Sequence, residues 1–140
     1  MRRYLVVANR TLGGDHLLAK VRESLAAGPS EFHVLVPASH TKDLLWTEGA
    51  DRATAEQRLA EALARFRAVG AAATGEVGDA NPVEAIGDVL RRETFDEIIL
   101  STLPPGVSRW LGQDLPHRVE KQFRLPVSHV VAAEEPAAAS

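Results

Sequence analysis

Apolar residues along this chain follow two periodicities that alternate from one end to the other. Short runs rich in apolar and β-branched residues are typical of strands buried on both faces, and they fall at residues 4–9, 32–38, 71–79, 95–102 and 126–132. Apolar positions spaced three and four apart predict amphipathic helices at residues 14–28, 54–70, 81–93 and 113–123. Alternating strands and helices predict a parallel, doubly wound α/β sheet with right-handed crossovers and helices on both faces.

Several helix ends can be assigned from local residue types. Asn81 is expected to cap the third helix, with Pro82 in the first helical position, where a missing N–H does no harm. Asp15 is expected to cap the first helix, and Gly70 to end the second one. A chain of 140 residues is long enough for one hydrophobic core. We therefore predict a single domain over residues 1–132 and a disordered tail over 133–140.

Composition excludes several classes of function. The net charge of −3 and the dispersed basic residues argue against a nucleic-acid or anionic-membrane partner. No cysteine is present, so disulfides and thiolate chemistry are excluded. No stretch approaches the roughly 20 apolar residues of a membrane span, and the first ten residues lack the features of a secretory signal. The expectation is a cytoplasmic protein.

Three stretches of the chain carry a resemblance to a known family. They are "LVVANRT" at the first strand, "GDANPVEAIGDVL" at the third helix, and "DEIILSTLPPGVSRWLGQDLPHRV" with the closing "LPVSHVV". Strand, loop, "SR-apolar" segment, helix and Pro-Val strand recur there in register, and in this respect the chain resembles the universal stress protein (UspA-like) family up to about residue 132. The resemblance implies a three-layer, Rossmann-like fold of the adenine nucleotide alpha-hydrolase type. Its five parallel strands would have the order 3-2-1-4-5.

The resemblance also implies partners and a role. Many members of the family dimerise through the last strand, so a homodimer is expected, with an interface at Val127, His129 and Val131. Pairing that strand with its symmetry mate would cover an exposed sheet edge. A role in the stress response and binding of an adenine nucleotide would follow from the same likeness.

One branch of the family binds ATP through three glycines after the fourth strand, and this chain lacks all of them. The first two glycines fall on Ser101 and Pro104, and the closing position falls on or beside Asp114. Pro104 and Pro105 offer no N–H to a phosphate. Asp114 would repel a phosphate by about 4 kcal/mol at roughly 4 Å and an effective dielectric near 20. ATP binding in the family's manner is therefore disfavoured.

Arginines could replace the missing backbone donors. Arg10 follows the first strand and Arg109 lies after the fourth, where both could face one crevice, and a guanidinium can hold an anion by a bidentate fork. The alternative is that both arginines are solvated or paired with carboxylates. The candidate ligand-binding residues are Asn9, Arg10, Thr11, Ser101, Thr102, Gly106, Ser108 and Arg109. The ligand would be an adenine nucleotide or a small anion, and no cofactor is certain.

Other chemistry is less well supported. The histidines at 16, 33, 40, 117 and 129 form no pair at helical spacing and have no carboxylate at ligand spacing, so no metal site is predicted. Trp46 and Trp110 could stack on a planar ligand or cover the end of the sheet. No general base or nucleophile stands out, and we predict no catalytic residue and no enzyme. Three classes stay open: a nucleotide or anion binder, an interaction scaffold whose Pro-Pro loop fills the crevice, and a nucleotide hydrolase.

Overall fold

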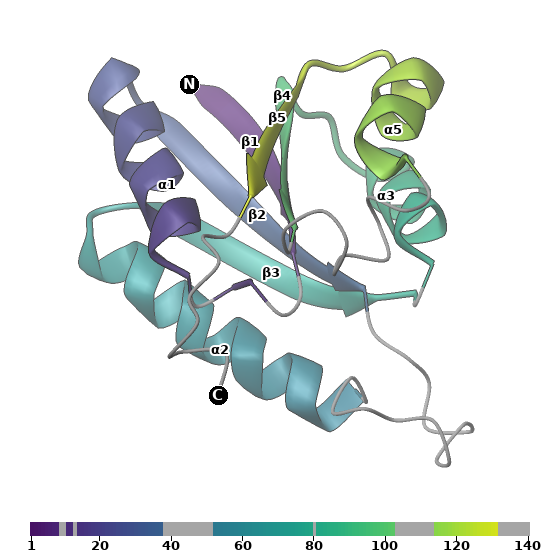
Figure 1. Cartoon of the computed structure of the whole chain (residues 1–140). Helices are drawn as coiled ribbons and strands as arrows, with labels where there is room; N and C mark the ends of the chain where they lie inside the picture. The colour runs from purple at the N-terminus through teal and green to yellow at the C-terminus, as the bar shows by residue number, and fades with distance from the viewer. Residues whose placement is uncertain (9–10, 13, 38–51, 80, 103–113, 132–140) are drawn as a thin grey trace.

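The fold is known from a computed structural model, which describes residues 1–8, 11–12, 14–37, 52–79, 81–102 and 114–131. Its elements follow one another in the order β1 (Arg2–Val7), α1 (Asp15–Ala27), β2 (Ser30–Pro37), α2 (Arg52–Ala68), β3 (Ala72–Gly78), α3 (Pro82–Leu90), β4 (Glu97–Thr102), α5 (Leu115–Phe123) and β5 (Val127–Val131). Figure 1 traces this order by colour. Each strand and helix predicted from the periodicity is present, with ends displaced by up to three residues.

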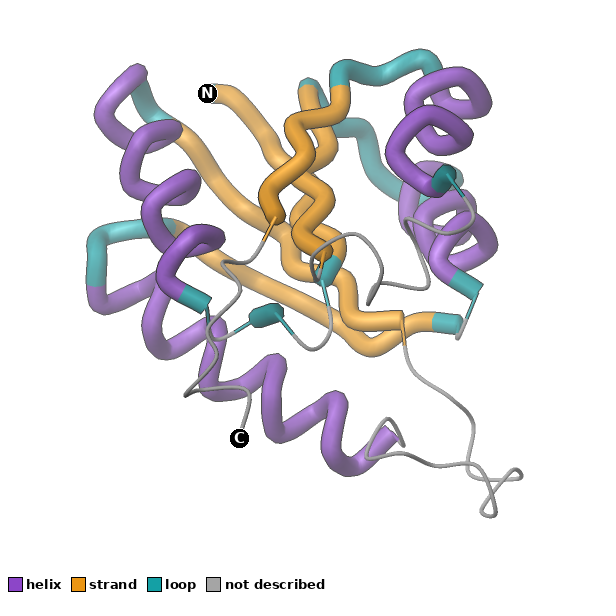
Figure 2. Tube along the Cα trace, viewed as in Figure 1, coloured by secondary structure: helices purple, strands orange, loops and turns teal. Residues whose placement is uncertain are grey.

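The five strands form one parallel sheet in the order β3-β2-β1-β4-β5, which is the predicted order. Figure 2 shows α1 and α2 on one side of the strands and α3 and α5 on the other. The fold therefore has three layers, as predicted. The chain first builds outward from β1 to β3 and then crosses to β4 on the opposite side of β1. Between β1 and β4 the strand order reverses, and in open α/β sheets ligands bind beyond the carboxyl ends of strands at such a point.

Two hydrophobic cores lie on the two faces of the sheet, because successive strand residues point to opposite faces. Tyr4 and Val6 of β1 belong to the core beneath α1 and α2, whereas Leu5 and Val7 belong to the core beneath α3 and α5. This explains why β1 reads as a continuous apolar run. Among the described residues no helix combines the length and the apolar character needed to cross a membrane.

Two of the three helix ends predicted from the sequence are confirmed, and one is wrong. Asn81 caps α3, its side-chain oxygen accepting hydrogen bonds from the N–H groups of Val83 and Glu84. Gly70 follows α2 with a φ of 95°, the left-handed backbone that favours glycine at a helix end. The predicted cap at Asp15 is wrong. Extended Gly14 occupies the N-cap position without a side-chain cap, and Asp15 is the first helical residue.

Replacing Asn81 with alanine is expected to lower the free energy of unfolding by about 1 kcal/mol, because two N–H groups of the first turn of α3 lose their acceptor. Urea denaturation monitored by circular dichroism would measure the loss. Asn81→Ser keeps an acceptor oxygen and serves as the control, with a loss of no more than a few tenths of a kcal/mol. Equal losses in both variants would contradict the capping role.

Candidate functional site at the carboxyl ends of the central strands

Polar side chains gather where β1 and β4 end. Ser101 and Thr102 are the last residues of β4, and Thr11 follows β1 after a short connection. Thr11, Ser101 and Thr102 are 6%, 2% and 2% exposed. Three buried hydroxyl groups thus lie at the point where the strand order reverses, which is where the sequence placed the candidate site.

The hydroxyls of Thr11 and Ser101 bind each other. Their Oγ1 and Oγ atoms lie 2.6 Å apart, within a buried environment. This contact joins the segment after β1 to the end of β4, so the structure brings together two of the predicted site residues. Among the described residues every buried side-chain nitrogen or oxygen has a hydrogen-bond partner. The pair therefore forms a satisfied polar floor beneath the candidate site.

Thr102 points to the other face of the sheet, as strand alternation requires. Its Oγ1 shares a hydrogen bond of 2.8 Å with Nε2 of His129 on β5. The structure therefore separates Thr102 from the Thr11–Ser101 pair and joins it to a residue predicted for the dimer interface. Although His129 is largely exposed, its Nε2 lies against the buried Thr102, and this burial lowers the pKa of the imidazole below its ordinary value near 6.5.

Because the pKa of His129 is lowered in the folded protein, the free energy of unfolding is expected to depend on pH. In the unfolded chain the imidazole takes up a proton near pH 6.5, while in the folded chain it does so only at lower pH. The free energy of unfolding should therefore decrease as the pH falls from about 6.5 towards the folded-state pKa, and rise with pH across that window. Urea denaturation between about pH 5 and pH 8 would measure this dependence.

His129→Gln is expected to reduce that pH dependence, because glutamine does not titrate. His16→Gln is the matched control, since His16 is exposed on α1. If the wild type, His129→Gln and His16→Gln show the same slope of stability against pH, the assignment to His129 is wrong.

A groove of about 400 Å³ runs between α5 and β5. It is lined by Asp114, Pro116, His117, Glu120, Val127 and His129. Asp114 stands at the N-cap of α5 with φ 57° and ψ 41°, a left-handed backbone that glycine adopts most easily. The family resemblance placed the closing glycine of the ATP-binding branch on Gln113 or Asp114. Asp114 therefore combines a carboxylate with a backbone conformation that glycine favours.

The remaining candidate residues lie outside the part of the chain that the structure describes. They are Asn9, Arg10, Gly106, Ser108 and Arg109, together with Pro104, Pro105, Trp46 and Trp110. The tail predicted for residues 133–140 also lies there.

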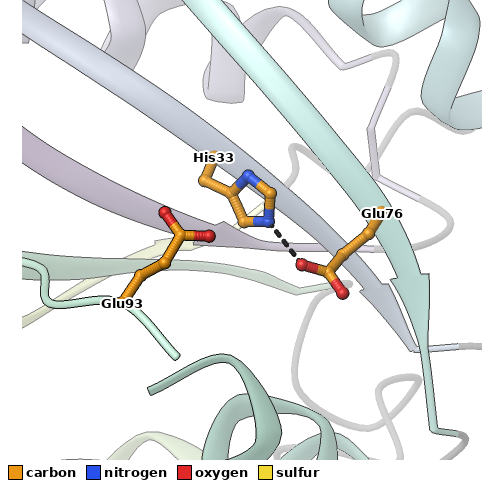
Figure 3. Close-up of side chains that lie close together, drawn as sticks. All are labelled: His33, Glu76 and Glu93. Atoms are coloured by element: carbon orange, nitrogen blue, oxygen red, sulfur yellow. Dashed lines mark hydrogen bonds and ion pairs between the residues drawn. The ribbon is translucent and has the colours of Figure 1, made fainter. Parts of the chain in front are cut away.

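A second polar cluster, which the sequence did not predict, lies on the α3/α5 face of the sheet. Figure 3 shows His33 of β2 between Glu76 of β3 and Glu93 of the α3–β4 connection. The His33 ring donates or accepts at both nitrogens, with Nδ1 2.8 Å from Thr74 Oγ1 and Nε2 2.7 Å from Glu76 Oε2. Among the described residues His33, Glu76 and Glu93 are the group whose ligand-type atoms all lie within 4.8 Å of one another.

Arginines hold both carboxylates of this cluster. Arg92 Nη2 donates to both carboxylate oxygens of Glu76 at 2.8 Å. Burial pushes the pKa of Glu76 up, but hydrogen bonds from Arg92 and His33 outweigh it, and that pKa lies below its ordinary value. Arg3 donates through Nη2 to Glu93 at 2.7 Å and through Nε to Glu31 at 2.5 Å.

No local pattern in the sequence indicates this cluster. Its members come from segments that are far apart along the chain, so no local spacing relates them. In the parallel register His33 lies opposite Thr74, and alternation places Glu76 on the same face two residues further on. Knowledge of the register would have been needed to predict the contact.

Comparison with known proteins agrees with this architecture. No family model matches the chain, and no curated protein matches its sequence. A universal stress protein solved in complex with cAMP is 16% identical, with a TM-score of 0.61 over 94% of this chain and 98% of that one. The universal stress protein of Archaeoglobus fulgidus in complex with dAMP is 16% identical, with a TM-score of 0.56 over 93% and 97%. A member of the universal stress protein family from Burkholderia pseudomallei is 16% identical, with a TM-score of 0.60 over 91% and 93%.

The sheet order and the three layers define a Rossmann-like α/β protein whose polar residues gather at the switch point. Within this class the chain has the fold of the universal stress proteins. The fold that the sequence resemblance implied is thereby confirmed.

Proposed function

We propose that this protein is a non-catalytic, universal-stress-type module that binds a small anionic ligand at the carboxyl ends of β1 and β4. The observation that supports this proposal is the gathering of buried hydroxyls at the switch point, centred on the Thr11–Ser101 pair. Ligands of open α/β sheets bind beyond such strand ends. An adenine nucleotide with a single phosphate is the ligand that agrees best with this position.

The donors that the chain offers favour a single phosphate over a triphosphate. Pro104 and Pro105 remove two backbone donors from the loop after β4. A triphosphate needs many such donors, whereas one phosphate can be held by a guanidinium fork from Arg10 or Arg109. Two structures of the same fold hold cAMP and dAMP, each of which carries one phosphate. ATP is therefore expected to bind more weakly than AMP or cyclic AMP.

Calorimetric titration with AMP, cyclic AMP and ATP, with and without Mg²⁺, tests the proposal. We expect AMP or cyclic AMP to bind, and Arg10→Ala combined with Arg109→Ala to weaken binding by at least tenfold, as loss of charged hydrogen bonds requires. Arg22→Ala combined with Lys121→Ala removes the same charge from exposed helical positions and is the matched control. Tighter binding of ATP, or full binding by the Arg10/Arg109 variant, would overturn the proposal, and turnover of any nucleotide would overturn the non-catalytic assignment.

Asp114 offers a more selective test of the same site. Asp114→Asn removes the charge and keeps a residue that tolerates the left-handed backbone, whereas Asp114→Gly also relieves the backbone. If the carboxylate repels the ligand, both variants should bind AMP roughly three- to tenfold more tightly, and more so at low salt. Tightening in Asp114→Gly alone would assign the effect to the backbone. Unchanged affinity in both variants would show that Asp114 does not face the ligand.

The proposal includes a homodimer formed through β5. This strand stands at the end of the sheet order and pairs with β4, and no other strand in the described part of the chain covers its second edge. Val127 and Val131 are half-buried and His129 is exposed, which fits a surface that a second copy would cover. Light scattering should give the mass of a dimer at micromolar concentration, and Val131→Lys should give a monomer. A monodisperse wild-type monomer would count against this part of the proposal.

If no nucleotide binds, the interaction-scaffold alternative is favoured over ligand sensing. Dimer formation would then be unaffected by Arg10→Ala and Arg109→Ala, because the edge of β5 lies apart from the strand ends of β1 and β4 in the sheet order.

A further inference from the structure

We propose that His33, Glu76 and Glu93 form a binding site for one divalent transition-metal ion, of which zinc is the expected occupant. The three side chains come from β2, β3 and the α3–β4 connection, and they lie on the sheet face opposite to the Thr11–Ser101 pair. The site is therefore independent of the proposed nucleotide site.

The geometry of the three side chains is close to that of a metal-binding set. One ligand-type atom from each residue lies within 4.8 Å of the other two. Tetrahedral zinc with N and O ligands at roughly 2.1 Å would place them about 3.4 Å apart. His33 Nε2 and Glu76 Oε2 are already 2.7 Å apart. A small separation of these two atoms and a small inward movement of Glu93 would complete the set.

The three side chains differ in exposure. The His33 side chain is 12% exposed, and the ring stacks on Phe95 with a centroid distance of 6.1 Å. The side chains of Glu76 and Glu93 are 31% and 33% exposed. The imidazole is thus the most enclosed of the three, and an ion could reach the site from the solvent side of the two carboxylates.

Further residues orient each ligand, as the outer shell of a metal site does. Without an ion, His33 Nε2 donates to the Glu76 carboxylate, which can only accept. An ion would replace that proton, and Nδ1 would then donate to Thr74 Oγ1, which lies 2.8 Å away. Arg3 Nη2 donates to one oxygen of Glu93, Oε1, at 2.7 Å, so the other oxygen can coordinate. Arg92 Nη2 donates to both oxygens of Glu76, so Glu76 would have to release one of these hydrogen bonds to coordinate the ion.

The local charge permits a cation but limits its affinity. Arg3 and Arg92 contribute two positive charges, against three negative charges from Glu31, Glu76 and Glu93. With a neutral imidazole the cluster therefore carries one net negative charge. A divalent ion would be attracted, although both arginines oppose it, so we expect micromolar affinity and not that of a closed structural site.

The donor set selects the class of metal. One imidazole nitrogen with two carboxylate oxygens suits zinc, cobalt and manganese, whereas Mg²⁺ and Ca²⁺ favour oxygen ligands alone. Three protein ligands leave one coordination position for water. The ion would link β2 and β3 to the α3–β4 connection, and binding should therefore raise the thermal stability of the protein.

Calorimetric titration of chelator-treated protein with Zn²⁺ tests the proposal, with Co²⁺ absorption as a second readout. We expect one equivalent of Zn²⁺ to bind to the wild type. His33→Gln and Glu93→Gln should each weaken binding by at least tenfold, since loss of an outer-shell partner alone costs roughly 10- to 100-fold. Glu23→Gln is the matched control, because Glu23 on α1 makes a charged contact with Lys20 and lies outside this cluster. Its affinity should stay within about threefold of the wild type, and so should that of His16→Gln, which removes an exposed histidine of α1.

Three results would overturn the site. They are no zinc uptake by the wild type at about 100 µM, unchanged affinity in both ligand variants, or an equal loss in Glu23→Gln. Circular dichroism of each variant checks the fold, and Glu93→Gln keeps the test decisive if His33→Gln is unfolded, because the Glu93 side chain is one-third exposed. Nucleotide binding by these variants should equal that of the wild type.

Discussion

Replacing Phe32 with alanine is expected to lower the free energy of unfolding by about 3–5 kcal/mol, which is a large share of the roughly 5–15 kcal/mol typical of a domain. Phe32 is 2% exposed and joins β2 to β1 and α2. Its ring stacks on Tyr4 with a centroid distance of 5.2 Å and meets the edge of Phe66 at 6.2 Å. Alanine would leave a cavity and remove both ring contacts.

Urea denaturation would measure this loss, with two variants for comparison. Phe32→Leu keeps most of the apolar volume and is expected to cost about 1–1.5 kcal/mol. Phe123→Ala truncates a half-buried ring at the end of α5 and should also cost less than Phe32→Ala. A loss below about 1 kcal/mol for Phe32→Ala would contradict the packing of the α1/α2 core.

The order of elements could be predicted because the strands carry short apolar runs and each helix carries an apolar stripe. β1 and β4 read as continuous apolar runs since they lie in the middle of the sheet, covered on both faces. The strand order itself came from the family resemblance, because periodicity does not say which strands are neighbours. Periodicity also does not determine the register of β2 against β3. The contact of His33 with Glu76 depends on that register and could not be predicted either.

The error at Asp15 has a local cause. Asp15 and Gly14 are both acceptable at an N-cap, so sequence alone did not decide between adjacent positions. The extended backbone at Gly14, with φ −78° and ψ 147°, places the start of the helix there. The carboxylate of Asp15 instead lies 3.5 Å from the guanidinium of Arg65 on α2. Its position in the first turn of α1 also gives it a favourable interaction with the helix dipole.

Asp114 shows what residue identity leaves undetermined. A glycine of the family's ATP-binding branch falls on or beside Asp114 by resemblance, and Asp114 has a left-handed backbone, which glycine adopts most easily. Aspartate tolerates this conformation better than most residues do. Residue identity at such a position therefore predicts the charge presented to a ligand better than it predicts the path of the chain.

Substitutions in the Thr11–Ser101 pair, which lies at the floor of the candidate site, are expected to have the second large effect on stability. Ser101→Ala would leave the buried hydroxyl of Thr11 without its partner, and Thr11→Val would do the same to Ser101. Each single substitution is expected to cost about 1–3 kcal/mol, the penalty of a buried polar group left unpaired. The double variant has no hydroxyl to satisfy, so its loss should be well below the sum of the two single losses.

A double-mutant cycle of the four proteins, measured by urea denaturation, gives the coupling energy of the pair. We expect it to be about 1 kcal/mol or more, because the two hydroxyls are in direct contact. Thr11→Val combined with Ser128→Ala is the control cycle, since the hydroxyl of Ser128 on β5 donates to Glu97 and not to Thr11. Additive losses in the Thr11–Ser101 cycle would mean that each hydroxyl has another partner. A loss of nucleotide binding in the double variant with little loss of stability would show that the ligand uses these hydroxyls directly, because a purely structural pair would change stability and affinity together.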